Sequence, residues 1–511
     1  MAVRTAVDDV ADHRVRWWAS ARRLLRSRHV WGVGLLSLGV GGAQAAIGIQ
    51  QYRQFRLGGY DLVIFDQAIR AYSRFGLPIS QMKDVHNPGQ VTAGYGHAFS
   101  ILGDHFSPIL AVLAPLYWLW NNPQVLILAQ AALFACAVPF AWLFTIRSLS
   151  SVVAAYFVAF AFGISWELQE ASAAGFHEVG FFVPLCAQML ERYQAGRLRQ
   201  AVIAAGVLLL VKEDAGYVVA MFGLVVLLGR SRARRQRWVG AGLLVGGVAV
   251  AQLVLHLWIP ALGGRSDYYW YWTRLSATPS MKDAVLRVIL HPAYAAQVAT
   301  TPSVKVSTFW WLVVPLLLMC FGSPLVLLAA PLVAERAFSN DPGHWGLGPQ
   351  YNAFLAPILV LAAVDAVRRL TGFAPERRAY LARRAAVVWA LAVAVIAAWT
   401  SWTTFPLGQA LRPSDWQSNA FQRAQTAAVA IIPNGASVEA DDNISTHLSS
   451  RTNVVLLDQT PHLREWVVLQ TFATEFPLTQ DQLRARVAWL LAHGYRQAFE
   501  QDDVYVFRKA G

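Results

Sequence analysis

Long apolar runs separated by arginine-rich loops constrain this chain more than any other feature of its sequence. The first run covers residues 30–50, and ten more follow residue 122, about 11 in all. Several approach the roughly 17–25 residues that a helix needs to cross a hydrocarbon core of about 30 Å. Hydrophobic residues make up 56% of the 511 residues and charged residues only 14%, too little charge for a soluble protein of this length. The sequence therefore predicts an all-α polytopic membrane protein whose later spans cover residues 123–146, 152–165, 180–190, 201–211, 216–228, 238–259, 308–321, 324–333, 351–367 and 385–404.

The placement of arginine predicts which ends of these spans face the cytoplasm. Arginine is concentrated in residues 1–29, 192–199, 230–237 and 368–384, and loops rich in arginine or lysine tend to remain inside the cell. The arginines beside the predicted spans therefore account for the net charge of +13, and we expect no nucleic-acid partner. A further apolar stretch, residues 106–120, would put residues 230–237 outside if it crossed the membrane. We therefore interpret it as a re-entrant or interfacial segment on the outer side.

These assignments predict a multi-pass protein of the cell membrane in three parts. Residues 1–29 form a cytoplasmic basic N-terminus, and residues 30–409 form a transmembrane domain with an outer loop at residues 51–122. Residues 410–511 have the composition of a soluble α/β domain, which the parity of the spans places outside the cytoplasm. Within it, helical periodicity marks residues 422–432 and 480–492, and strand character marks residues 437–440, 453–457, 465–469 and 503–508.

Asp61 is the first candidate for chemistry because it begins an amphipathic stretch in the outer loop. Leu62, Phe65 and Ile69 follow it at helical spacing, so Asp61 can cap a helix that lies along the membrane surface. Asp66 follows five residues later, away from that face. A role as helix N-cap alone is the alternative for Asp61, and a solvated side chain is the alternative for Asp66.

Other ionisable residues lie at or near the predicted outer face, where charge is costly and needs a partner or a function. Adjacent Asp104 and His105 could bind a metal or a phosphate, or only form hydrogen bonds in an interfacial turn. Lys212 could simply neutralise Glu213 or Asp214 in a polar turn. An arginine at the end of a span could hold an anionic headgroup, or it could snorkel. The candidates for substrate binding are Asp104, His105, His177, Glu178, Lys212, Arg336, His344 and Tyr351.

Strong stand-alone motifs are missing from the sequence. It contains no His-Glu-x-x-His, no Gly-x-Ser-x-Gly and no P-loop. Cys136, Cys186 and Cys320 each fall inside an apolar run, so we expect neither a disulfide framework nor a thiolate metal site.

Several segments resemble a known family. That family is an uncharacterised prokaryotic group of predicted membrane proteins with a domain of unknown function, grouped with the GT-C superfamily of polytopic glycosyltransferases. GT-C enzymes use sugars linked to polyprenyl phosphate. The resemblance extends from about residue 50 to the C-terminus, and it is carried by residues 60–67 (YDLVIFDQ), 105–108 (HFSP), Gln130, residues 176–177 (FH), 212–214 (KED) and 433–440.

The resemblance implies a GT-C-like fold and a function for Asp61. GT-C enzymes place an acidic residue in the first outer loop, on or before a helix parallel to the membrane, and Asp61 matches that position. Asp61 would be the general base that takes a proton from the acceptor hydroxyl. Leu62 follows it where well-studied members often have a second acid, which argues against direct metal binding by such a pair. Further acidic candidates for the catalytic site are Asp66, Glu213 and Asp214.

The same resemblance implies the partners of the reaction. These are the lipid bilayer and a polyprenyl-phosphate-linked sugar donor, while the acceptor stays undetermined. Lys212, Arg336, His344 and His105 would stabilise charge on the departing phosphate, and residues 106–120 would cradle the prenyl chain. Glu213 and Asp214 would orient the acceptor or hold a divalent cation, Mg or Mn, so the cofactor stays open.

Two other functions remain open from the sequence. A transporter or flippase of a lipid-linked or small polar substrate would need ionisable groups near the bilayer midplane and repeated, interrupted helices, and we find no such repeat. A non-catalytic assembly or sensing protein would bind a partner through residues 410–511. An uptake assay set against a sugar-transfer assay separates the first function from an enzyme.

Overall fold

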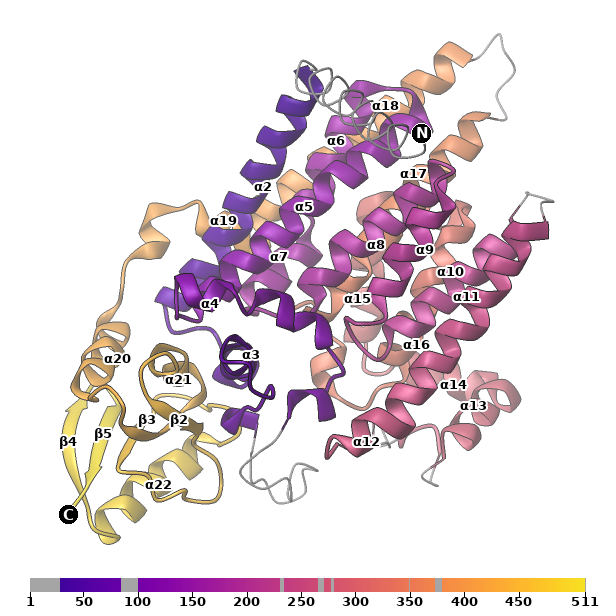
Figure 1. Cartoon of the computed structure of the whole chain (residues 1–511). Helices are drawn as coiled ribbons and strands as arrows, with labels where there is room; N and C mark the ends of the chain where they lie inside the picture. Colours follow the sequence, from indigo (N-terminus) through magenta and orange to yellow (C-terminus); the bar gives the residue numbers. More distant parts are fainter. Residues whose placement is uncertain are drawn as a thin grey trace, which may run out of the picture.

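The computed structural model describes residues 28–83, 100–229, 234–264, 271–276, 280–348, 350–372 and 379–510 (Figure 1). The predicted cytoplasmic N-terminus, residues 1–29, lies outside these ranges except for its last two residues. Helices form most of the molecule, and a small mixed sheet forms the C-terminal part, so the predicted fold class is confirmed.

Within the described residues, five helical segments are long and apolar enough to cross a membrane. They are α2 (Arg28–Arg53), α5 (Gln124–Leu149), α6 (Val152–Gly163) continued by α7 (Trp166–Ala173), α11 (Arg234–Leu253) with its extension to Ala261, and α18 (Ala379–Thr403). Other predicted spans are shorter helices: α8 (Val179–Gln194), α9 (Leu198–Leu208), α10 (Ala215–Leu228) and α17 (Ala356–Gly372).

The predicted span at residues 308–321 is wrong as a continuous helix, whereas residues 324–333 are helical but begin as a 3-10 helix. The chain instead forms α15 (Val304–Val313), several 3-10 turns and α16 (Ala330–Phe338). Pro315 cannot donate a backbone hydrogen bond and clashes with the preceding turn. Leu317 and Leu318 then adopt positive φ values of 55° and 60°, which ends the helix.

Residues 106–120, predicted to be re-entrant or interfacial, form a 3-10 helix, η3 (Pro108–Leu113), and one turn of α-helix, α4 (Leu116–Leu119). A segment of this length is too short to cross a core of about 30 Å. Trp118 donates its indole N–H to the carbonyl of Ser73 at 2.7 Å, which fastens the segment to helix α3 (Gly59–Ser73) in the predicted outer loop.

The C-terminal sheet has the strand order β2-β1-β3-β5-β4, parallel from β2 to β3 and antiparallel beyond. Helices α20 (Ala420–Ile431) and α22 (Gln480–Ala492) and four of the strands match the predicted segments closely. Helix α21 (Asp442–Leu448) and strand β4 have no counterpart in the predictions. The strands are β1 (Ser437–Ala440), β2 (Asn453–Leu456), β3 (Trp466–Gln470), β4 (Tyr495–Gln501) and β5 (Val504–Lys509).

The C-terminal domain packs directly against helix α3 (Figure 1). Gln67 of α3 donates its amide to the carbonyl of Val454 at 3.0 Å. His447 of α21 stacks on the rings of Tyr52 and Phe55, with ring centroids 4.2 and 3.9 Å away, and its Nε2 lies 2.9 Å from the Tyr52 carbonyl. These contacts hold the sheet domain against the end of α2 and the start of α3.

Figure 1 shows that the start of α2, the end of α17 and the start of α18 lie at one end of the molecule, whereas α3 and the C-terminal domain lie at the other. Arg147 near the end of α5 forms an ion pair with Glu191 near the end of α8, so these two helix ends also meet. Several predicted cytoplasmic ends therefore lie opposite helix α3.

Candidate functional site

Asp61 lies in the first turn of α3, and its carboxylate stays accessible. The helix begins at Gly59 with Gly58 as its N-cap, so the prediction that Asp61 caps the helix is wrong. Leu62, Phe65 and Ile69 are buried as their spacing predicted. The Asp61 side chain keeps 52% of its surface exposed.

His177 faces Asp61, with Nε2 3.5 Å from Asp61 Oδ1, and its side chain is only 3% exposed. Its backbone N–H donates to Gln130 at 2.9 Å, and Gln130 in turn donates to the carbonyls of Ala171 and Gly175. Surrounding protein atoms oppose ionisation of Asp61, but its contact with His177 and the charges of Lys83 and His105 outweigh them and lower its pKa. The base candidate is therefore ionised at neutral pH.

A second group of polar residues joins the loop before η3 to the turn between α9 and α10. His105 lies with Nδ1 2.9 Å from Glu213 and Nε2 3.8 Å from Asp104. The backbone N–H of Phe106 donates to the other Glu213 oxygen at 3.1 Å. Burial opposes protonation of His105, but the charges of Asp104 and Glu213 outweigh it and raise its pKa to about 9. His105 is consequently a cation at neutral pH.

Lys83 completes this group and was missed by the sequence reasoning. Its ammonium lies 2.7 Å from Asp104 and 4.6 Å from the ring centroid of Tyr60, the residue before Asp61. Lys83 is the single lysine in residues 51–122, and that isolation in an outer loop was a signal that could have found it.

Lys212 is buried between two acids. Its Nζ lies 3.7 Å from Glu178 and 3.7 Å from Asp214, and it lies 5.7 Å from the ring centroid of Tyr351. Burial raises the pKa of Asp214 to about 7, and the neighbouring acid Glu335 adds to this while Lys212 opposes it. The three consecutive charges at 212–214 thus contact two different parts of the site and form more than a neutral turn.

A small polar recess joins these residues to the segment after α15. It is lined by Lys212, Asp214, Leu332, Glu335, Arg336, His344, Tyr351 and Phe354. Arg336 donates to the side chain of Asn352 at 2.7 Å. His344 lies against Tyr351, with ring centroids 4.5 Å apart, and burial together with nearby cations lowers its pKa to about 3. His344 is therefore neutral and can only offer hydrogen bonds.

Asp66 does not belong to the site, which corrects the predictions of a catalytic or solvated role. Its side chain is 0% exposed and lies 2.6 Å from Arg70. The hydroxyl of Tyr117 donates to its other oxygen at 2.8 Å. A buried carboxylate needs such partners, so Asp66 fastens α3 to α4.

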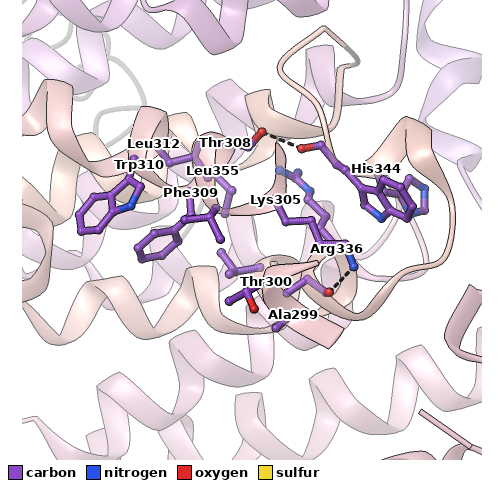
Figure 2. A pocket seen from close by; sticks show the side chains of 14 residues that line it. Ala299, Thr300, Lys305, Thr308, Phe309, Trp310, Leu312, Arg336, His344 and Leu355 are labelled. Carbon is purple, nitrogen blue, oxygen red and sulfur yellow. Dashed lines mark hydrogen bonds between the residues drawn. The ribbon is translucent and has the colours of Figure 1, made fainter. Parts of the chain in front are cut away.

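Two apolar cavities lie near these polar groups. One has a volume of about 280 Å³, and Figure 2 shows Phe309 and Trp310 at one end and Arg336 and His344 at the other. A second cavity of about 500 Å³ runs along η3 and is lined by Pro108, Ile109, Val112, Leu133, Cys136, Phe140, Phe181, Pro184, Leu185, Gln188, Val207 and Leu210.

Within the residues that the structure describes, no group of three or more histidine, cysteine or acidic side chains could hold a metal ion. Glu213, one of the two acids proposed for a divalent cation, instead accepts hydrogen bonds from His105 and Phe106.

Comparison with solved structures finds ArnT from Cupriavidus metallidurans, once bound to undecaprenyl phosphate and once in the apo state. The sequence identities are 11% and 12%, and each alignment covers 94% of this chain and 98% of that chain with a TM-score of 0.49. No residue role follows from a likeness this distant. No curated protein matches the chain. Residues 51–506 match the family described as predicted membrane protein (DUF2079), which confirms the family resemblance of the sequence, and the chain belongs to this family.

Proposed function

We propose that this protein transfers a sugar from a polyprenyl-phosphate donor to an acceptor hydroxyl at the outer membrane face. The observation that carries the proposal is the Asp61 carboxylate, which is exposed, ionised and 3.5 Å from the buried His177. His177, which lies 3.5 Å from Asp61, is followed in the chain by Glu178, which lies 3.7 Å from Lys212. Two consecutive residues therefore connect the base candidate with the polar recess, and we infer that both act on one substrate.

In the proposed reaction, the acceptor oxygen forms a bond to the anomeric carbon of the sugar. The bond from that carbon to the phosphate oxygen breaks, and polyprenyl phosphate leaves with the electron pair. Asp61 takes the proton of the acceptor hydroxyl as the new bond forms. A lowered pKa keeps this carboxylate ready to accept hydrogen bonds from the hydroxyl in the ground state.

The leaving phosphate needs positive charge, which Lys212, Arg336 and His105 supply. Both carboxylates near Lys212 lie at 3.7 Å, beyond the roughly 2.7–3.2 Å of an N–H···O hydrogen bond. The ammonium can thus turn its donors to a phosphate without losing a close partner. His344 contributes as a neutral hydrogen-bonding group.

Either apolar cavity could hold the prenyl chain of the donor, and we assign the chain to the cavity in Figure 2. That cavity shares Arg336 and His344 with the polar recess, so a phosphate at Arg336 would leave its tail at the mouth of the cavity. The cavity along η3 shares no lining residue with that recess. It corresponds to the prediction that residues 106–120 cradle the chain.

The experiment uses the purified full-length protein in proteoliposomes, a panel of synthetic polyprenyl-phosphate hexoses and a cell-envelope extract as acceptor. Release of polyprenyl phosphate is measured, because it reports transfer whatever the acceptor. Asp61→Asn should lower this release by about 10²–10⁴-fold, the usual contribution of a general base, with unchanged expression and membrane insertion.

Asp481→Asn is the matched control, since Asp481 has a 95% exposed side chain in the C-terminal domain, and we expect it to match the unaltered protein. Equal release by Asp61→Asn and the unaltered protein would remove Asp61 from the mechanism. No release from any donor, together with uptake of substrate into the vesicles, would favour the transporter instead.

A further inference from the structure

The helix that carries Asp61 is capped by a residue from the C-terminal domain. Gly58, its N-cap residue, has no side chain with which to accept a hydrogen bond. The backbone N–H of Tyr60 instead donates to Asp442 Oδ1 at 2.6 Å, across 382 residues of sequence. Asp442 therefore accepts from the second residue of α3, the position at which a side-chain cap ordinarily acts.

The position of Asp442 follows from the topology of the sheet. Asp441 and Asp442 come directly after β1, which lies between β2 and β3, so they stand where the chain order reverses at the carboxyl ends of parallel strands. Open α/β sheets bind their ligands at this switch point. Here Asp441 caps its own helix α21 by accepting a hydrogen bond from the backbone N–H of Ile444 at 2.9 Å. Asp442 instead accepts the hydrogen bond from Tyr60 at the start of α3.

Glycine is needed at the start of α3 for this close approach. A Cβ atom on Gly58 would lie 2.6 Å from Asp442 Oδ2, and one on Gly59 would lie 2.7 Å from the Asp442 carbonyl oxygen. The positive end of the helix dipole then faces the carboxyl group of Asp442, an arrangement that stabilises the first turn.

We propose that Asp442 is a positioning residue for the transfer reaction: by capping α3 from the C-terminal domain, it fixes the first turn of the helix and hence the direction of the Asp61 carboxylate. This inference rests on the proposed function. Asp61 directly follows the capped Tyr60, so a first turn that frays moves the base away from His177 and from the acceptor hydroxyl. The C-terminal domain is therefore a part of the catalytic apparatus.

Asparagine should replace Asp442 well. Burial raises the pKa of Asp442 to about 7, with the charges of Asp61 and Glu475 adding to the rise and the hydrogen bond from Tyr60 opposing it. A neutral group at this position that keeps its carbonyl oxygen can accept the same hydrogen bond. Asparagine is also among the best N-cap residues.

The experiment compares three variants in the proteoliposome assay, together with hydrogen–deuterium exchange of the amides at the start of α3. Asp442→Ala should lower kcat roughly tenfold, within the range expected from losing one cap, leave the KM for the donor unchanged, and speed exchange at Tyr60. Asp442→Asn should keep both values near those of the unaltered protein. Gly58→Ser combined with Asp442→Ala should recover kcat, because the alanine removes the steric clash and serine can cap the helix locally.

The inference is overturned if Asp442→Ala leaves kcat or the Tyr60 exchange unchanged, or if the asparagine variant loses as much as the alanine variant. Its failure is distinct from failure of the proposed function. If only the positioning role of Asp442 fails, Asp61→Asn is inactive while Asp442→Ala is fully active. If the proposed function fails, neither the unaltered protein nor any variant releases polyprenyl phosphate, but amide exchange at Tyr60 still reports whether Asp442 caps α3.

Discussion

At the scale of single residues, His105 shows how two carboxylates keep an imidazole charged. Both of its ring nitrogens face carboxylates, Glu213 at 2.9 Å and Asp104 at 3.8 Å. The imidazolium has two donors for these acceptors, whereas the neutral ring has one. His344 lies among cations and apolar side chains and titrates in the opposite direction. Two histidines of one site therefore supply different groups at neutral pH.

The raised pKa of His105 predicts the alkaline limb of the reaction. His105 is protonated below about pH 9 and loses its charge as the pH rises through that value. If its charge stabilises the leaving phosphate, the rate of transfer should fall over the same range. In His105→Lys the fall in rate should occur at a higher pH, because lysine has a pKa of about 10.4.

The measurement is the pH dependence of kcat/KM for release of polyprenyl phosphate, with His105→Gln as the uncharged control. His105→Gln should be slower at neutral pH and should lack the limb. An alkaline limb that stays in place in both variants would show that another group titrates there.

At the scale of elements, two apolar cavities lie between helices near the site. The cavity in Figure 2 is lined from α14 (Pro292–Thr300), α15, α16 and the segment around His344. The second cavity is lined by η3 and by helices α5, α8 and α9. Either cavity is apolar enough for a lipid tail, and they can be distinguished by filling each in turn.

We expect Ala299→Trp, which fills the cavity in Figure 2, to raise the KM for a long-chain donor roughly tenfold, about 1.4 kcal/mol of lost binding, and to leave a short-chain donor unaffected. Cys136→Trp, its counterpart in the cavity along η3, should change neither value. Kinetics with donors of two prenyl lengths test this. If Cys136→Trp raised the KM for the long-chain donor and Ala299→Trp did not, the prenyl chain would lie in the cavity along residues 106–120, as the sequence predicted.

At the scale of the whole molecule, sidedness decides whether the site can meet a lipid-linked sugar outside the cell. The Asp61 helix and the C-terminal domain lie at the end opposite the start of α2 (Figure 1). The arginine loops predict that the start of α2 is cytoplasmic. If so, the site and the C-terminal domain face outward.

Cysteine labelling tests this orientation in a protein whose Cys136, Cys186 and Cys320 are replaced by alanine. Asp481→Cys, in the C-terminal domain, should react with a membrane-impermeant maleimide on intact cells. Arg199→Cys, beside the predicted cytoplasmic turn before α9, should react only after the cells are permeabilised. The opposite pattern would place Asp61 in the cytoplasm and remove the proposed donor from reach.

The sequence by itself determined the features that depend on local patterns. Apolar runs predicted most of the helices, and strand character marked four of the five strands. It missed β4, because most of that strand is exposed and lacks an alternating apolar face. It also missed α21, which has only seven residues, among them Asp442, Asn443, Ser445 and Thr446, and these are poor helix formers.

The tertiary structure alone decided which charged residues meet. Asp66 and Arg70 are four residues apart on one helix, a spacing at which side chains meet. Nothing in the sequence indicated that Tyr117 would contact the other oxygen of Asp66, or that Asp442 would cap the helix of Asp61. Periodicity reports which face of a segment is buried, because burial repeats with the turn of the helix. It does not report which distant side chain lies across that face, because that contact is set by how the elements pack.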